Sequence, residues 1–237
     1  MRVPFVPNTL ILLSVLGLLL LAAMLHAGYV RSTFLPTPPL NITTSTGLLG
    51  WRIEALRYDQ AACQKAMAHP NIVKTHLKDR KIQNGCGWQN ALSLKRVGAA
   101  KLGGVRLSCP MAAGVSLWLN QIVQPAAQKH FGKKVTRLIH YGTYACRNIK
   151  GSLFSKYLNM RSEHATANAI DIGGFILSNG QTISVLKHWQ GTGPKAKFLH
   201  EVNKGACSYF RVVLGPEANR LHKDHFHFDR GLLLRCS

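Results

Sequence analysis

The longest feature of the hydrophobic pattern lies at the N-terminus. Residues Thr9 to Val30 form an apolar run of 22 residues in which His26 is the one ionisable group. Such a run is long enough to cross the hydrocarbon core of a bilayer as an α-helix. We therefore predict a transmembrane signal anchor over 9–30, after a short cytoplasmic segment over 1–8. A cleavable signal peptide is the alternative, although the apolar cores of such peptides are typically shorter.

The rest of the chain shows both helical and strand-like periods. Apolar residues at helical spacing predict helices over 53–67, 111–131 and 195–204. Pro125 is expected to kink or end the second of these helices. Apolar runs bounded by turn residues predict strands over 135–141, 169–177, 182–186, 211–214 and 224–229. Because the strands group after helices, we expect an α+β domain with an antiparallel sheet and flanking helices, preceded by the one transmembrane helix.

The segment between the apolar run and this domain has a different composition. Ser32 to Gly47 is rich in Pro and Thr and carries no charge. Such a composition is typical of an extended spacer, here one that holds the domain off the membrane. The predicted organisation is therefore a linker over 31–50 and one domain over 51–237.

Composition narrows the functional classes. The 237 residues are 46% hydrophobic, which is enough for a buried core, and they carry a net charge of +21 with a pI near 10.2. This charge excludes an ordinary near-neutral cytosolic enzyme and indicates an anionic partner. Nucleic acid, acidic lipid headgroups and an anionic cell-wall polymer all qualify. A nucleic-acid binder is disfavoured because the sequence has no familiar binding motif and begins with an export signal.

Cysteine usage also indicates export. The six cysteines are scattered and form no CxxC pair, which argues against a zinc ribbon or a thioredoxin-like site. Behind an export signal, an even number of scattered cysteines predicts three disulfides, with six buried free thiols as the alternative. Spacing favours one pair, Cys63 with Cys86, because the loop between them is short and polar.

The nine acidic residues are unevenly placed. Four of them, Glu163, Asp171, Asp224 and Asp229, lie in two short stretches that also contain histidines. In the first stretch His164 precedes Asp171 by seven residues. A His on a loop and an Asp on the following strand could face one metal ion.

The second stretch has a strand pattern with chemistry on one face. His225 and His227 alternate with Phe226 and Phe228, so on a strand the histidines would share one face and the phenylalanines the other. One face would then be a site and the other face core. A surface histidine cluster, or a core strand with one hydrogen-bonded histidine, is the alternative.

Together the two stretches supply His164, Asp171 and His227 as three metal ligands. Three protein ligands plus water is the pattern of catalytic zinc. Zn²⁺ lowers the pKa of bound water to about 7. Asp224, three residues before His227, is the candidate general base. His225 is the candidate for stabilising an oxyanion or sharing the base role.

The two stretches also resemble known proteins. SEHATANAID and the later HKDHFHFD are similar to motifs of the zinc D-Ala-D-Ala metallopeptidases and their lysostaphin- and hedgehog-related relatives. From Trp51 to Cys236 the chain resembles the bacterial extensin-like C-terminal domain family, through CPMAA at 109–113, YACRN at 144–148 and LGPEAN at 214–219. The resemblance implies a hedgehog/D-Ala-D-Ala-peptidase-like fold.

The resemblance also implies roles for individual residues. It carries the zinc ligands over to His164, Asp171 and His227. Asp224 stands where relatives have a catalytic acid, and Arg147 resembles an arginine that binds substrate or steadies the oxyanion. One departure is an alanine at position 167, where the dipeptidases have glycine.

These features lead to one expected function. The chain is expected to be a zinc-dependent peptidase, single-pass in a bacterial inner membrane, with its domain in the periplasm. Its expected substrates are amide bonds of peptidoglycan stem peptides or cross-links, cleaved as an endopeptidase or a carboxypeptidase. The expected partner is peptidoglycan or another anionic cell-envelope polymer. The alternative is a non-catalytic, zinc-containing cell-wall binding module.

Overall fold

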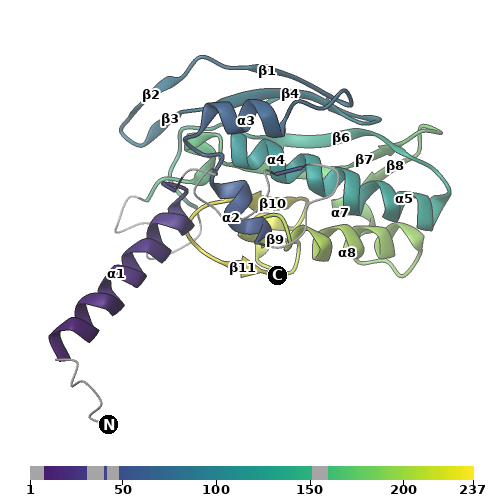
Figure 1. Cartoon of the computed structure of the whole chain (residues 1–237). Coiled ribbons are helices and arrows are strands. Elements are labelled where there is room, and N and C mark those ends of the chain that lie inside the picture. The colour runs from purple at the N-terminus through teal and green to yellow at the C-terminus, as the bar shows by residue number, and fades with distance from the viewer. Residues whose placement is uncertain (1–7, 31–39, 42–47, 151–159) are drawn as a thin grey trace, which may run out of the picture.

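The computed structural model describes residues 8–30, 40–41, 48–150 and 160–237. The predicted cytoplasmic segment and most of the predicted linker lie outside these residues. In Figure 1 a long N-terminal helix projects from a domain in which helices pack beneath a curved sheet.

The projecting helix is α1 (Asn8–Ala27), which coincides with the predicted anchor. Its span Thr9–Ala27 has a mean hydropathy of 2.5; its residues are exposed as far as Met24, and Leu25 to Ala27 are partly covered by the domain. At 1.5 Å per residue its 20 residues cover about 30 Å, the thickness of a bilayer core. By length and composition α1 can cross a membrane, and an N-terminal signal sequence would meet the same criteria.

The single helix predicted over 53–67 is two helices, α2 (Leu49–Glu54) and α3 (Gln60–Ala66). The chain breaks between them because Asp59 caps α3. Its carboxylate accepts a hydrogen bond from the amide of Ala62 at 2.9 Å. An aspartate at this position satisfies an amide that the first turn of a helix leaves unpaired.

Five strands in the basic region between α3 and the next helix were not predicted. They are β1 (Ile72–His76), β2 (Arg80–Gln83), β3 (Cys86–Trp88), β4 (Ala91–Val97) and β5 (Ala100–Ser108). Along β5 buried apolar residues alternate with the exposed Lys101 and Arg106, and in β4 buried apolar residues flank the exposed Lys95 and the half-buried Arg96. The high local charge obscured this period-two pattern. Strands therefore lie on both sides of the central helices in the sequence, and the predicted grouping of strands after helices is wrong.

The helix predicted over 111–131 is one helical path with a wider turn inside it. It consists of α4 (Cys109–Trp118), a π-helical turn η2 (Leu119–Val123) and α5 (Gln124–Phe131). Pro125 does not end the path. Proline has no amide hydrogen to bond the carbonyl four residues earlier, and the π turn lies where that bond is missing.

The C-terminal half follows the predicted pattern closely. Its strands are β6 (Val135–Gly142), β7 (Ala169–Leu177), β8 (Thr182–Ser184), β9 (Val212–Leu214), β10 (Phe226–Asp229) and β11 (Arg235–Cys236). Its helices are the short α7 (Val185–His188), α8 (Pro194–Ala206) and the 3₁₀ turns η3 (Glu163–Thr166) and η4 (Arg220–His222). The strand predicted over 182–186 ends at Ser184, whose side chain caps α7.

The strands form one nine-stranded sheet and one two-stranded hairpin. The order in the large sheet is β1-β4-β5-β6-β7-β10-β9-β11, with β8 beside β7, while β2 pairs with β3. Most pairs are antiparallel; β5 with β6 and β9 with β11 are parallel. The protein is thus a mixed α+β structure with a mainly antiparallel sheet, as predicted. In Figure 1, α4, α5 and α8 lie together below β1, β4 and β6.

The core forms where these helices meet the C-terminal strands. Trp118 at the end of α4 is fully buried, and its indole donates to the carbonyl of Val202 in α8 at 2.9 Å. Its ring packs edge-on against Phe228 with centroids 5.3 Å apart. Phe226 and Phe228 are both fully buried, so the predicted core face of this strand is confirmed.

Three disulfides are present, as predicted, and they join Cys63 with Cys109, Cys86 with Cys146, and Cys207 with Cys236. The predicted pair Cys63–Cys86 is wrong. Cys63 lies in α3, buried against the start of α4, whereas Cys86 opens β3 in the separate hairpin. Sequence distance was a poor guide because the fold places these two elements apart.

Candidate metal centre

The pairing of β7 with β10 brings the two His-containing stretches together. In this antiparallel ladder His227 lies directly opposite Asp171, and Phe228 lies opposite Ile170. Directly paired residues project from the same face of a sheet. His227 and Asp171 therefore share a face, 56 residues apart in the chain.

The third side chain, His164, is positioned by the short 3₁₀ turn η3. His164 sits in η3, which Ser162 caps by accepting a hydrogen bond from the His164 amide at 3.4 Å. The turn closes at Ala167, whose φ of 55° lies in the left-handed region. This conformation is easier for glycine. Alanine adopts it here in the turn that holds His164.

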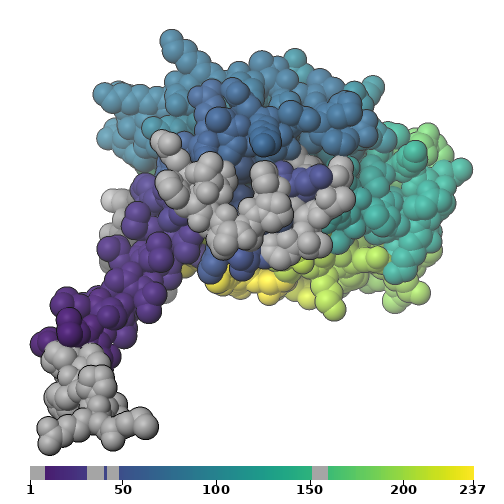
Figure 2. Space-filling model, in the orientation of Figure 1, coloured from purple at the N-terminus to yellow at the C-terminus, as the bar shows by residue number. Residues whose placement is uncertain are grey.

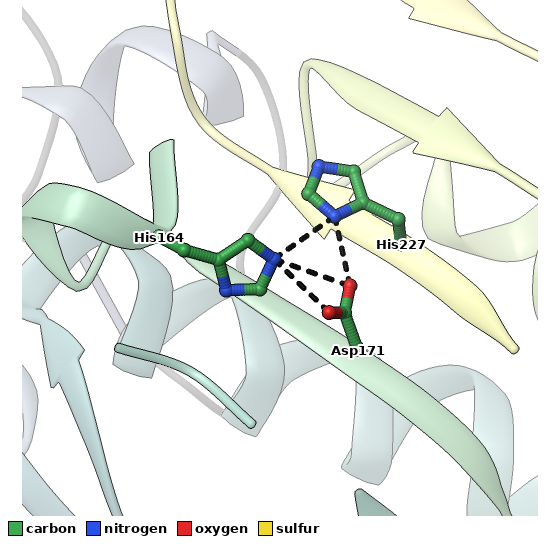
Figure 3. Close-up of side chains that lie close together, drawn as sticks. All are labelled: His164, Asp171 and His227. Carbon is green, nitrogen blue, oxygen red and sulfur yellow. Dashed lines mark hydrogen bonds and ion pairs between the residues drawn. The ribbon is translucent and has the colours of Figure 1, made fainter. Parts of the chain in front are cut away.

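Figure 3 shows the three side chains pointing at one another. His164 Nε2 lies 3.2 Å from a carboxylate oxygen of Asp171 and 3.2 Å from His227 Nδ1. His227 Nδ1 lies 2.9 Å from Asp171 Oδ1. These residues are mostly buried, and His164 is only 2% exposed. We refer to His164, Asp171 and His227 as the triad.

The triad fits a tetrahedral zinc ion. Ligands held about 2.0–2.1 Å from Zn²⁺ lie about 3.3 Å from one another, close to the separations found here. The ring nitrogens His164 Nε2 and His227 Nδ1 also face each other, and at most one proton can lie between them. A shared cation would satisfy both nitrogens and the carboxylate together. Imidazole nitrogen and carboxylate oxygen are both common zinc donors.

The charges within the triad are strongly coupled. Burial alone would raise the pKa of Asp171, but hydrogen bonds from His164 and His227 hold it well below its usual range. Burial alone would lower the pKa of His227, but its bonds to Asp171 and Asp229 raise it to about 9. In the absence of a metal, the site therefore holds a proton on His227 at neutral pH.

Asp224 and His225 lie beside the triad as a hydrogen-bonded pair. The chain bends at His225, so β10 starts only at Phe226, and Asp224 is not turned toward the core. Its carboxylate lies 2.8 Å from His225 Nδ1. The other ring nitrogen, His225 Nε2, lies 3.7 Å from Asp171 Oδ1. The sequence-predicted site residues Asp224 and His225 thus lie beside the triad, with His225 between Asp224 and Asp171.

Arg147 lies near the triad through its backbone rather than through its side chain. Its backbone lies against the turn that carries His164, since its carbonyl accepts from the Ser162 amide at 3.0 Å. Its guanidinium contacts the carbonyl oxygen of Asn148 at 3.5 Å. The structure thus places the Arg147 segment beside the site without a contact between its side chain and the triad among the described residues.

Sequence reasoning assigned no role to Asp229, which the structure places behind His227. One Asp229 oxygen lies 3.0 Å from His227 Nε2, and the other accepts from the Gly231 amide at 2.9 Å. A carboxylate in this position fixes which ring nitrogen carries the proton, leaving Nδ1 free to bind a metal. The i, i+2 spacing on one strand face was a signal for it.

The rings of two further residues, Tyr141 and His222, lie close to the ring of His225. The ring of Tyr141 lies 5.8 Å from that of His225, and the ring of His222 lies 5.2 Å from it. Burial, followed by the neighbouring His227 and His225, lowers the pKa of His222 to about 4, so this ring is neutral at pH 7. His222 belongs to the second His-containing stretch of the sequence, but sequence reasoning assigned a role to neither His222 nor Tyr141.

The comparisons with known proteins give one match. A family model described as "Extensin-like protein C-terminus" matches residues 61–236. These residues include the triad, Asp224, His225, Asp229 and all three disulfides. No curated protein and no solved structure matches the chain significantly. On this match, the chain belongs to the extensin-like C-terminal family.

Proposed function

We propose that this protein is a zinc-dependent peptidase that hydrolyses amide bonds of peptidoglycan peptides. The observation that carries the proposal is the convergence of His164 Nε2, Asp171 and His227 Nδ1 within 3.2 Å. The resemblance of the two triad-bearing stretches to the zinc D-Ala-D-Ala metallopeptidases supports the same class. A hedgehog/D-Ala-D-Ala-peptidase-like fold is part of this proposal.

The triad would hold the ion through two neutral imidazoles and one carboxylate. When bound, Zn²⁺ supplies Lewis-acid chemistry, which polarises a carbonyl and lowers the pKa of water. Asp171 brings one negative charge, so the ion would keep a net positive charge to act on substrate. Asp229 would hold the His227 ring in the ligating tautomer.

Asp224 and His225 would act as the general acid–base pair that transfers protons during hydrolysis. Asp224 holds the Nδ1 proton of His225, which leaves Nε2 facing the triad. In this arrangement the pair would accept a proton from the attacking water and return it to the leaving amine. A protonated His225 would also stabilise negative charge on the carbonyl oxygen. We assign Arg147 to substrate binding, on the resemblance and its segment's place beside the turn.

The cell envelope is the proposed setting. α1 would anchor the protein in a bacterial inner membrane, with the domain in the periplasm, where disulfides persist. The net charge of +21 suits an anionic envelope polymer such as peptidoglycan. A zinc-holding binding module without turnover is the second candidate. The Asp224–His225 pair beside the triad favours catalysis, because metal retention alone would not require it.

The test measures zinc content and cleavage of defined muropeptides by the full-length protein in detergent. Wild type should bind about one zinc and cleave an amide bond, and a chelator should abolish cleavage. His164→Ala and His227→Ala should each lose the metal. Asp224→Asn should keep zinc, while turnover falls by about 10²–10⁴-fold through loss of a proton acceptor. His225→Ala should also keep zinc and lose about 10²–10³-fold.

His76→Ala is the matched control, because this histidine lies on β1 at the far edge of the sheet. It should leave zinc and turnover unchanged. Full zinc occupancy in both ligand variants would remove the triad from the proposal. Zinc binding without cleavage of any muropeptide would favour the binding module. Wild-type turnover in a zinc-loaded Asp224→Asn protein would exclude Asp224 from the mechanism.

A further inference from the structure

The end of α1 is seated directly on the folded domain. The carbonyl of His26 accepts a hydrogen bond from the buried guanidinium of Arg211, and its ring nitrogen Nε2 lies 3.1 Å from the carbonyl of Leu232. Gly28 follows with a φ of 81°, and a Cβ there would meet the backbone oxygen of Glu54 at 2.6 Å. The predicted spacer therefore does not separate the end of α1 from the domain.

A strongly apolar loop lies at this junction. Leu232, Leu233 and Leu234, between β10 and β11, are 70%, 69% and 75% exposed. We call these three residues the leucine loop. In Figure 1 the connection between β10 and β11 curves round beside the upper end of α1, which matches the contact between His26 and Leu232. Consecutive exposed leucines are unusual on a water-facing surface and mark an interaction site.

Aromatic residues surround the same junction. Tyr29, just after α1, stacks on Tyr58 with ring centroids 5.1 Å apart, and both rings are about half exposed or more. Trp51 in α2 is also exposed, and α2 packs against α1. Tyr and Trp are the side chains enriched where a membrane meets water, because one end is apolar and the other polar.

The depth of the junction follows from α1. If α1 fills the hydrocarbon core, its last turn at His26 lies at the membrane surface. The leucine loop is hydrogen-bonded to that turn, so it lies at the same depth. Figure 2 shows most of the length of α1 standing out from the domain. Arg235 follows the leucines directly and is exposed, placed to meet acidic headgroups.

We propose that the leucine loop inserts into the same bilayer face from which α1 emerges, and that it fixes the domain against the membrane surface. This rests on the anchoring part of the proposed function, and it is independent of zinc and of cleavage. The partner of the leucine loop is the boundary between lipid headgroups and acyl chains, which apolar side chains penetrate by about 5–10 Å. The protein would therefore work on substrate that lies close to the membrane rather than at a tether's length from it.

The test uses Leu233→Trp in the full chain, reconstituted in vesicles of phosphatidylcholine and phosphatidylglycerol. One set of vesicles carries bromine near the top of the acyl chains, which quenches only tryptophans that reach this depth. The matched control is Leu186→Trp, at a leucine of α7 that is 56% exposed; Figure 1 shows α7 on the side of the domain away from α1. Both changes exchange one exposed apolar side chain for another, so folding and zinc content should not change.

The signal is the emission of each variant after subtraction of wild type. Bromolipid should reduce the added emission of Leu233→Trp by about twofold or more, and should leave that of Leu186→Trp unchanged. Equal quenching of the two variants in chains that float with the vesicles would overturn the insertion and leave the anchor standing. Failure of wild type to float with the vesicles would overturn the anchor and the insertion together. Neither result alters the zinc and cleavage test.

Discussion

Asp229 is placed to orient His227, one of the three candidate metal ligands, from the side of the ring that faces away from the triad. One carboxylate oxygen of Asp229 accepts a hydrogen bond from the Gly231 amide, and the other oxygen faces His227 Nε2. An asparagine has one oxygen, so with that oxygen on the Gly231 amide its NH₂ group would face His227. The ring would then have to accept at Nε2 and carry its proton on Nδ1, the nitrogen that points into the triad.

Asp229→Asn is therefore expected to weaken zinc binding by about 10–100-fold while the chain stays folded. Competition with a chromophoric chelator measures this affinity. Glu163→Gln is the matched control, because the Glu163 side chain accepts a hydrogen bond from Asn168 and has no hydrogen bond or ion pair with a triad side chain in the described part of the chain. Its zinc affinity should match that of wild type. Equal affinities for Asp229→Asn and wild type would show that the Asp229 carboxylate does not orient His227.

The raised pKa of His227 predicts how the site responds to pH. In the metal-free chain the protonated ring is stabilised by Asp171 and Asp229. Its contribution to stability is fully present below the unfolded pKa of 6.5 and is lost as pH rises through about 9. Metal binding has the opposite dependence, because the ion requires the ring without its Nδ1 proton.

We expect the apparent zinc affinity to rise by about tenfold for each pH unit between pH 7 and 8.5. Over the same range the melting temperature of chelator-treated protein should fall. Chelator competition, corrected for the chelator's own protonation, and thermal melts give the two readouts. A zinc affinity that stays flat across this range would mean that His227 binds no proton in competition with the metal.

At the scale of elements, the disulfide Cys86–Cys146 joins the β2–β3 hairpin to the segment that carries Arg147. It closes 60 residues, whereas Cys207–Cys236 closes 29. In the chain-entropy account, loss of either disulfide lowers the free energy of unfolding by about 4 kcal/mol. The loss is about 0.6 kcal/mol larger for the disulfide that closes the longer loop.

Replacing Cys86 and Cys146 together by Ser should therefore lower the free energy of unfolding by up to about 4 kcal/mol, slightly more than replacing Cys207 and Cys236. Zinc should be retained in both double variants, since neither bond contains a ligand. Denaturant unfolding and metal analysis on the same samples test this. Loss of zinc from the Cys86/Cys146 variant would show that the hairpin supports the turn of His164.

At the scale of the whole molecule, one buried carboxylate joins the two ends of the domain. Glu54 in α2 is fully buried and lies 3.2 Å from the guanidinium of Arg230, with Arg57 and Arg211 also against it. Arg230 is 2% exposed and also donates to the carbonyl of Gly50 at 2.9 Å. The folded unit therefore includes residues that precede residue 61, where the family match starts.

Glu54→Gln should destabilise the protein by about 3–5 kcal/mol, because it leaves buried guanidiniums without a compensating charge. Glu201→Gln is the matched control. Glu201 pairs with Lys129 and His130 at the surface, where such a loss costs at most about 1 kcal/mol. Thermal or denaturant unfolding of both variants compares the two. Similar small losses would mean that the Glu54 cluster adds little to the stability of the domain.

The sequence alone determined the features that depend on local pattern. An apolar run of sufficient length specifies a long apolar helix, and alternation over Phe226–Asp229 specifies a strand with phenylalanines on the core side. The strand over Ala169–Leu177 was also predicted with its observed ends. The candidate ligands were found because carboxylates are rare in this chain and gather beside histidines. Local pattern did not identify β1 to β5, because Lys and Arg masked the buried positions of β1, β4 and β5, and β2 and β3 are only 4 and 3 residues long.

Tertiary structure decided everything that depends on distance in space. The β7–β10 register sets His227 opposite Asp171, and no spacing in the sequence encodes that register. The disulfide partners follow from which elements pack together, so proximity in sequence failed for Cys63. The roles of Asp229 and of the leucine loop emerge only when the strand, the following loop and the end of α1 are assembled. The physical reason is that local preferences act over a few residues, whereas a binding site is built from contacts between segments far apart in the chain.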